Sequence, residues 1–379
     1  MHNQRDGQPV RKSASVARPK LPVFSRESTS WLPGEMKPLS GAWYSGASWV
    51  KLLLPLAFVF RQIVRVRRQR YENNLDKRFK PPVPTVVVGN IAVGGTGKSP
   101  LVIQIAREMK ARGARPGIVS RGYGGKSGFY PLFVTASSDP AECGDEPVVL
   151  AGRTGCPVVV DPDRVAAVKK LLDEHDCDIV ISDDGLQHYA LDRDVEVAVV
   201  DGQRGLGNGY CLPAGPLREP VGRLKEVDFV VINGPGEPRL PCEGQRVMPE
   251  PTRFVNLETL APAALDTMAG ERVHAVTGIG NPSRFFNTLR SLGPDVIEHR
   301  FDDHHEYRIA DLMFGDSLPV IMTEKDAVKC RLLNPGSIHG NYWYLEMEVS
   351  MPPTFVTSLL SRMGLNVTPL KVVGGRENS

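Results

Sequence analysis

The chain has 379 residues, enough for two ordinary domains with sizeable cores. Its net charge of +3 hides a local excess, because residues 61–80 carry eight basic and two acidic side chains. The basic charge therefore forms one patch, which excludes a nucleic-acid-binding surface spread over the fold. Six cysteines are scattered without a C-x-x-C pair, which indicates a reducing compartment and excludes a disulfide scaffold and a structural zinc site.

The first eighty residues predict an extension followed by a membrane-associated helix. Residues 1–40 are rich in Pro, Ser and Arg, and we expect them to be disordered. A mostly apolar run over 42–60 has aromatic residues at its head and a cluster of arginines after it, which predicts a membrane-associated segment over 41–80. Lys51 and Pro55 weaken a continuous spanning helix. The segment therefore either spans the bilayer or lies on it, and an amphipathic helix packed on the protein's own core is the alternative.

From residue 84 onward, apolar runs alternate with amphipathic stretches, a pattern typical of a parallel sheet flanked by helices. We expect an α/β fold with a P-loop NTPase-like parallel-sheet domain over 81–235. Prolines interrupt the alternation over 236–268, which suggests a linker or a small irregular sheet. A second alternating block predicts a smaller α/β domain over 269–370, with a cleft between the two domains. The predicted strands are 85–89, 116–119, 157–160, 178–182, 195–200, 228–232, 273–277, 295–298, 318–323 and 342–349.

The stretch 85–100 predicts a phosphate-binding loop. A buried strand runs into a glycine-rich loop, and Lys98 and Ser99 follow at the start of an apolar helix. Backbone N–H groups of such a loop hold phosphate oxygens, Lys98 reaches the β- and γ-phosphates, and Ser99 binds Mg²⁺. Ala92 takes the place of the usual first glycine, and the glycines inside the loop would supply the missing backbone freedom. A plain strand–turn–helix is the alternative. The expected nucleotide-binding residues are Gly94, Gly95, Thr96, Gly97, Lys98 and Ser99.

A second cluster of polar residues follows the predicted strand 178–182. Asp183 and Asp184 end this strand as a Walker-B carboxylate does, and such a carboxylate holds Mg²⁺ directly or through water. Ligands of open α/β sheets gather at this edge, where the phosphate loop also lies. His188 comes four residues after Asp184 and could face the same site. The alternatives are an exposed Asp-Asp-Gly turn and a structural, hydrogen-bonding His188.

Further polar segments follow other predicted strands. Each would be a plain surface loop if taken singly, and their recurrence at strand exits favours a functional interpretation. In the second block, adjacent carboxylates and imidazoles suit proton handling or metal ligation, and the charged residues of 323–329 suit the cap of a helix. The candidate residues are Arg121 in 120–125, Asp145 and Glu146 in 144–147, Arg218 and Glu219 in 208–220, and Asp303, His304 and His305 in 301–307.

Together these segments resemble the tetraacyldisaccharide 4′-kinase family, the lipid A 4′-kinases of Gram-negative bacteria. The resemblance covers about residues 40–365, with the motifs in family order, and the apolar segment and its arginines match the family's N-terminal membrane anchor. Residues 1–35 extend beyond the usual start. The motifs are 88–90, 94–100, 120–125, 144–147, 183–188, 212–220 and 322–329.

The resemblance implies a P-loop kinase that uses ATP and Mg²⁺ to phosphorylate the 4′-hydroxyl of a lipid-linked disaccharide 1-phosphate. It assigns the catalytic base to Asp145, assisted by His304 with Asp303, although the neighbouring His305 leaves open which imidazole acts. It also implies metal binding by Ser99, Asp183, Asp184 and Glu219, and substrate binding or orientation by Arg121, Glu146, His188 and Arg218.

The resemblance also implies partners and a location. The partners are the lipid disaccharide 1-phosphate and the membrane surface, without nucleic acid and without an obligate protein partner, at the cytoplasmic face of the inner membrane. The alternatives are a membrane-associated regulatory P-loop NTPase that acts on a protein partner, and a non-enzymatic membrane tether. A switch needs fewer acceptor-side groups than this chain carries, which favours the kinase.

Overall fold

The protein's structure is a computed structural model that describes residues 39–333 and 341–365. The expected disorder of residues 1–40 falls outside the described residues, apart from Leu39 and Ser40, which begin helix α1 (Leu39–Ser45). The described residues from Leu39 onward group into one compact unit. The division into two α/β domains therefore stays a prediction, and the two blocks are described below as halves of one sheet.

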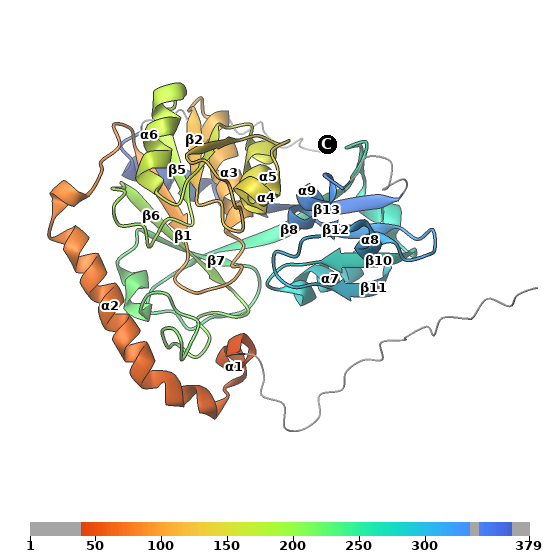
Figure 1. Cartoon of the computed structure of the whole chain (residues 1–379), viewed down its shortest axis with the longest axis horizontal. Coiled ribbons are helices and arrows are strands. Elements are labelled where there is room, and N and C mark those ends of the chain that lie inside the picture. The colour runs from red at the N-terminus through yellow and green to blue at the C-terminus, as the bar shows by residue number, and fades with distance from the viewer. Residues whose placement is uncertain (1–38, 334–340, 366–379) are drawn as a thin grey trace, which may run out of the picture. The chain divides into compact units, whose positions relative to one another are not determined.

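A 13-stranded sheet runs through the molecule, in the order β11-β10-β12-β13-β8-β7-β6-β1-β5-β2-β4-β3, with β9 paired to β8 (Figure 1). The central strands β7, β6, β1, β5, β2 and β4 are parallel, as the alternating pattern predicts. The strands are β1 (Thr85–Gly89), β2 (Pro116–Ser120), β3 (Leu132–Val134), β4 (Val158–Val160), β5 (Ile179–Asp183), β6 (Val195–Asp201), β7 (Phe229–Asn233), β8 (Gln245–Asn256), β9 (Pro262–Ala263), β10 (Arg272–Thr277), β11 (Asp295–Arg300), β12 (Val320–Thr323) and β13 (Tyr342–Ser350).

Helices cover both faces of the sheet (Figure 1), so the central strands are mostly apolar, with polar residues mainly near their ends. Val86 and Val88 of β1 pack in the same core as helix α3 (Lys98–Ala111), whereas Val87 packs in a core on the other face. Asp163 caps helix α6 (Arg164–Glu174), because its side chain accepts a hydrogen bond from Val165 N. The further helices are α2 (Leu54–Glu72), α3 (Lys98–Ala111), α4 (Pro140–Cys143), α5 (Asp145–Thr154), α6 (Arg164–Glu174), α7 (Pro282–Ser291), α8 (Ile309–Leu312), α9 (Glu324–Cys330) and α10 (Pro353–Arg362), with 3-10 turns η1 (Ser48–Leu53), η2 (Leu75–Lys77), η3 (Val221–Lys225) and η4 (Leu265–Met268).

Strand β8 joins the two halves of the sheet and lies inside the stretch 236–268, which was expected as a linker or a small irregular sheet. Its first residues pair in parallel with β7, and the rest pairs antiparallel with β13. Pro249 and Pro251 lie within this strand, and Pro251 sits next to a register shift in β13. Prolines lack the N–H that a ladder needs and therefore argue against a strand in a sequence pattern. Residues 245–256 are nonetheless a strand.

The N-terminal helices lie at the outside of the fold (Figure 1). Trp43 of α1 donates a hydrogen bond from Nε1 to Pro213 O at 3.0 Å, which attaches this segment to the core. Helix α2 exposes a stripe of apolar side chains at helical spacing, and Ala57 is its one buried residue among those described. The stripe consists of Leu56, Val59, Ile63 and Val66, which are 47 to 62% exposed.

No single described helix has both the length and the apolar composition needed to cross a bilayer. Leu39–Ser45 and Ser48–Glu72 satisfy that test only as a pair, bent by 108°. Membrane association therefore stays a prediction.

Candidate active site

The phosphate loop lies between β1 and α3, as predicted. The left-handed backbone falls on Gly94 (φ +96°) and Gly97 (φ +76°). Ala92 instead forms an antiparallel bridge with Leu217, and in that extended conformation alanine is unstrained. The loop therefore does not need a glycine at this position.

Two asparagines hold the loop from either side. Asn90 at the end of β1 donates from Nδ2 to Thr96 Oγ1 at 3.1 Å and to Gly94 O at 3.3 Å. Asn233 at the end of β7 donates from Nδ2 to Thr96 O at 2.8 Å. The loop is thus fixed by side chains from two strands, which leaves its conformation set before any ligand binds.

Lys98 and Asp184 meet directly beside this loop. Lys98 Nζ lies 3.5 Å from Asp184 Oδ1. Arg218 binds the same carboxylate through both terminal nitrogens, at 2.9 and 3.1 Å. Burial opposes the charge of Asp184, yet Lys98 and Arg218 hold the pKa of this carboxyl far below its usual value. The result is a fixed anion between two cations at the sheet edge.

The residues present fit a Mg²⁺ ion. Asp183 is fully buried, and its Oδ1 has no hydrogen-bond partner within the described part of the chain, while Oδ2 accepts from Ser120 Oγ at 3.2 Å. Burial, with Glu146 nearby, raises the pKa of Asp183, so its charged form needs a cation. No group of three His, Cys, Asp or Glu side chains among the described residues forms a metal cage. Mg²⁺ commonly takes only one or two carboxylates, with phosphates and water as its other ligands.

The second half of the sheet brings His304 to Asp145. His304 Nδ1 lies 3.2 Å from Asp145 Oδ2, and its Nε2 lies 3.9 Å from Asp303 Oδ1. Asp145 is 5% exposed at the start of α5, and His304 has a left-handed backbone with φ +61°. The hydrogen bond that His304 donates to Asp145 raises the pKa of His304. This pair can take up a proton beside the phosphate loop, because the carboxylate stabilises the imidazolium.

The neighbouring His305 is directed elsewhere. Its Nε2 lies 3.1 Å from Asp311 Oδ2, and its ring stacks on Phe301 with centroids 4.5 Å apart. Of the two imidazoles, His304 is thus the one in contact with Asp145. The sequence left this choice open, because both histidines follow the same acidic pair.

Comparison with known proteins identifies the family. Residues 49–364 match the family model described as tetraacyldisaccharide-1-P 4′-kinase. The tetraacyldisaccharide 4′-kinases of Alkalilimnicola ehrlichii and Nitrosococcus oceani are 54% and 48% identical, over 79% and 84% of this chain and 88% and 92% of theirs. The chain belongs to the tetraacyldisaccharide 4′-kinase family. The predicted resemblance is confirmed, and the chain is an enzyme, a kinase.

A solved structure supports the fold. The LpxK protein of Aquifex aeolicus, crystallised in complex with ATP, aligns with a TM-score of 0.67 at 26% identity, over 83% of this chain and 99% of that chain. The predicted α/β, P-loop NTPase-like fold is therefore confirmed. The membrane association of the N-terminal helix of this chain stays a prediction.

Two residues that the resemblance assigned to this kinase site lie in structural positions. His188 Nε2 accepts from Arg164 N at 3.0 Å, at the start of α6, and burial lowers the pKa of His188 to about 4. Glu219 is 1% exposed, and its Oε1 accepts from Gln187 Nε2 at 2.7 Å. Its Oε2 lies 3.3 Å from Arg223 Nε, so both oxygens already have partners. Metal binding by Glu219 and a role of His188 in substrate binding or orientation stay predictions.

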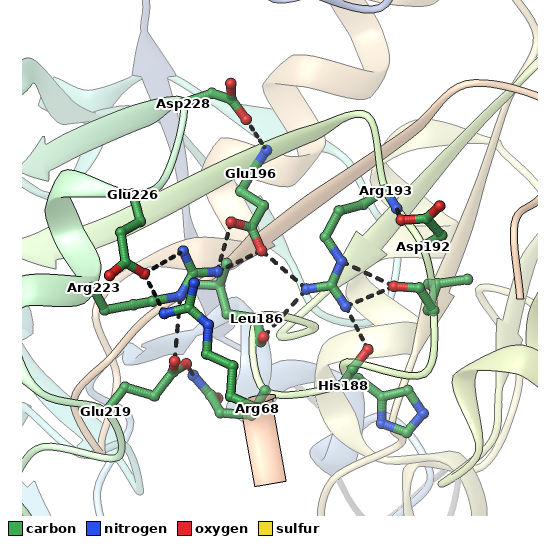
Figure 2. A network of polar contacts seen from close by, with 12 residues as sticks. Arg68, Leu186, His188, Asp192, Arg193, Glu196, Glu219, Arg223, Glu226 and Asp228 are labelled. Carbon is green, nitrogen blue, oxygen red and sulfur yellow. Dashed lines mark hydrogen bonds and ion pairs between the residues drawn. The ribbon is translucent and has the colours of Figure 1, made fainter. Parts of the chain in front are cut away.

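Figure 2 shows the network that holds Glu219. The guanidinium of Arg223 lies among three carboxylates, those of Glu196, Glu219 and Glu226. Arg68 of α2 also pairs with Glu226, so the network reaches from the N-terminal helix to the loop that precedes η3. These contacts place Glu219 in a charge cluster, which Gln187 links to Asn90 by donating to both Glu219 Oε1 and Asn90 O.

The remaining predicted residues lie around the site. Arg121 is an exposed cation after β2, in the loop whose Tyr123 ring lies 5.1 Å from the His304 ring. Glu146 forms an ion pair with Lys325 of α9. Asn90 and Asn233 were not predicted as site residues, although each is a polar residue at the end of an apolar strand run. Lys325 was expected only as part of a helix cap, because nothing in the sequence pattern pointed to its contact with Glu146.

Proposed function

We propose that this chain transfers the γ-phosphoryl group of ATP to the 4′-hydroxyl of a tetraacyldisaccharide 1-phosphate, in lipid A biosynthesis. The observation that carries the proposal is the contact of His304 with Asp145, because it sets a proton acceptor beside a phosphate loop that already holds Lys98. A nucleotide-binding fold without an acceptor has no need of such a pair.

Each part of the site has a task in this reaction. The loop amides and Lys98 hold the β- and γ-phosphates, and the Asp145–His304 pair accepts the proton of the acceptor hydroxyl. The acceptor oxygen bonds to the γ-phosphorus as the bond to the bridging oxygen breaks, and ADP leaves. Bound Mg²⁺ would neutralise charge on the transferred group, held by Ser99, Asp183 and Asp184.

The membrane is the expected source of the acceptor. The apolar stripe of α2 is exposed, and arginines of the same helix flank it. Such a helix suits insertion into the headgroup region of an anionic membrane. The enzyme would therefore meet its acylated substrate at the cytoplasmic face of the inner membrane, without leaving the lipid surface.

The test is a phosphorylation assay with purified protein, ATP, Mg²⁺ and a tetraacyldisaccharide 1-phosphate in detergent micelles. The expected product carries one additional phosphate by mass spectrometry. Lys98→Ala should abolish the product, while Asp145→Ala should keep ATP binding and lower kcat about 10²- to 10⁴-fold. ATP hydrolysis without any lipid product would refute the proposal and favour a regulatory NTPase, and an unchanged kcat of Asp145→Ala would refute the role of the pair.

A further inference from the structure

Helix α9 stands against the start of α5, although the two lie far apart in the sequence. Thr323 caps α9 by accepting from Asp326 N, so the helix begins with its acidic and basic side chains in fixed places. Lys325 of α9 pairs with Glu146. Residues 323–329 therefore do more than cap a helix, because they also contact the two acidic residues at which α5 begins.

Lys329 extends this contact to Asp145. Its Nζ lies 3.8 Å from Asp145 Oδ2, 3.2 Å from Asp326 Oδ1 and 5.2 Å from the centre of the Tyr307 ring. Within the described residues this buried ammonium makes ion pairs but no hydrogen bond. A buried ammonium is costly unless its charge serves a partner. Its two carboxylate neighbours are thus what keeps it there.

Asp326 connects Lys329 to the loop of His304. Asp326 is fully buried, and its Oδ2 accepts from Thr277 Oγ1 at 3.0 Å and from Thr323 Oγ1 at 2.6 Å. Gly278 N also approaches Asp326, at 3.3 Å, while Gly278 O accepts from His304 N at 3.1 Å. One side of α9 therefore fixes both members of the Asp145–His304 pair.

We propose that Lys329 is a positioning residue for phosphoryl transfer, which keeps Asp145 ionised and directed at His304. This inference rests on the proposed function. The ammonium of Lys329 lies 3.8 Å from the carboxyl of Asp145 in a buried setting, where a nearby positive charge strongly favours the ionised form of a carboxyl over its protonated form. A carboxylate stabilises the imidazolium of His304 and holds the ring by a hydrogen bond, and a protonated Asp145 would do neither as well.

Other charges also face Asp145, so the effect of Lys329 is one contribution among several. Burial opposes the charge of Asp145, and the hydrogen bond from His304 together with the surrounding cations lowers its pKa below the usual value. The facing groups are His304 and Asp303 from the loop after β11, Lys325 and Lys329 from α9, Glu146 from α5, and Cys143 from α4.

The experiment is a pH profile of kcat/KM for Lys329→Met, with the lipid acceptor varied at saturating ATP and Mg²⁺. Methionine keeps the length of the side chain and removes the charge. We expect the acidic limb to move up by about one pH unit, which is about a tenfold loss below the limb, with little change above it. The KM for ATP should stay the same, because the described contacts of Lys329 are with Asp145, Asp326 and Tyr307 and not with the phosphate loop.

Two further variants control the result. Lys329→Arg keeps the positive charge and should restore the wild-type limb. Lys170→Met removes a partly exposed lysine of α6 that pairs with Glu174, and should leave the profile unchanged. Thermal melts of all variants show whether they are folded at the assay temperature.

The outcomes separate the two proposals. A loss of kcat/KM that is equal at every pH, or a limb that stays in place, would refute the role of Lys329, since a purely structural defect does not move a titration. An active wild type with that result would leave the proposed function standing. A wild type that phosphorylates no lipid would refute the proposed function and with it the inference.

Discussion

Replacement of Arg223 by methionine should lower the free energy of unfolding by about 3–5 kcal/mol. The side chain is 3% exposed, and its Nη2 contacts both oxygens of Glu196, at 2.5 and 2.6 Å (Figure 2). Its Nε lies 3.3 Å from Glu219 Oε2. Methionine preserves most of the volume, so the change removes the charge and the hydrogen bonds but leaves the packing.

The size of the loss follows from the carboxylates left behind. Glu196 keeps Arg193 at 3.1 Å and Glu219 keeps Gln187 at 2.7 Å, yet each loses its shared guanidinium, and Glu219 is 1% exposed. An uncompensated buried charge is what makes the removal of one partner so costly, far beyond the net worth of the intact pair. We therefore expect a loss in the free energy of unfolding of about 3–5 kcal/mol for Arg223→Met.

The loss should also depend on pH. Burial opposes the charge of Glu196, but Arg223 and Arg193 hold its pKa below the ordinary value of 4.5. A carboxyl with a lowered folded pKa contributes stability that is present above its unfolded pKa and lost as the pH falls through the folded value. The difference between wild type and Arg223→Met should therefore shrink on acidification below about pH 4.5.

Urea denaturation at neutral and acidic pH measures both effects, with the m-value as a check on comparable unfolding. Arg362→Met is the matched control, because Arg362 is 62% exposed and pairs with Asp228 at 3.0 Å. It should lose less than about 1 kcal/mol. A loss for Arg223→Met as small as that of the control would refute the reasoning, and so would a double variant with Glu196→Gln that recovers no stability.

Two other predictions concern the phosphate loop and helix α2. Gly97→Ala should weaken ATP binding, measured by calorimetry, at least about tenfold. The reason is that a Cβ at this position would lie 1.9 Å from Asn233 Nδ2, on a backbone with φ +76°. Gly222→Ala is the control, because a Cβ there meets nothing within 4 Å. Unchanged affinity in Gly97→Ala would contradict the loop geometry. Replacement of Leu56, Val59 and Ile63 together by serine should lower the fraction of protein that sediments with anionic vesicles at least about tenfold. Met313→Ser, at a side chain that is 66% exposed, should leave that fraction unchanged. Full retention of the triple variant on the vesicles would contradict membrane docking through α2.

The fold could largely be predicted from the sequence, because its elements depend on local pattern. Each predicted strand is present, and the loop before Lys98 has the expected place between β1 and α3. Strand β8 escaped prediction, because Pro249 and Pro251 mask its pattern, and its pairing with β13 involves residues about ninety positions away.

The candidate site could likewise be predicted from the sequence only in part. The sequence by itself determined the phosphate loop, the Asp183–Asp184 pair and the family, since motif spacing and residue type carry that information. Only the tertiary structure decided that His304 rather than His305 contacts Asp145, that Glu219 lies in a buried ion pair with Arg223, and that Lys329 faces Asp145. These contacts join segments up to 184 positions apart, between Asp145 and Lys329. Local spacing cannot specify such pairs, because they form only when the two halves of the sheet come together.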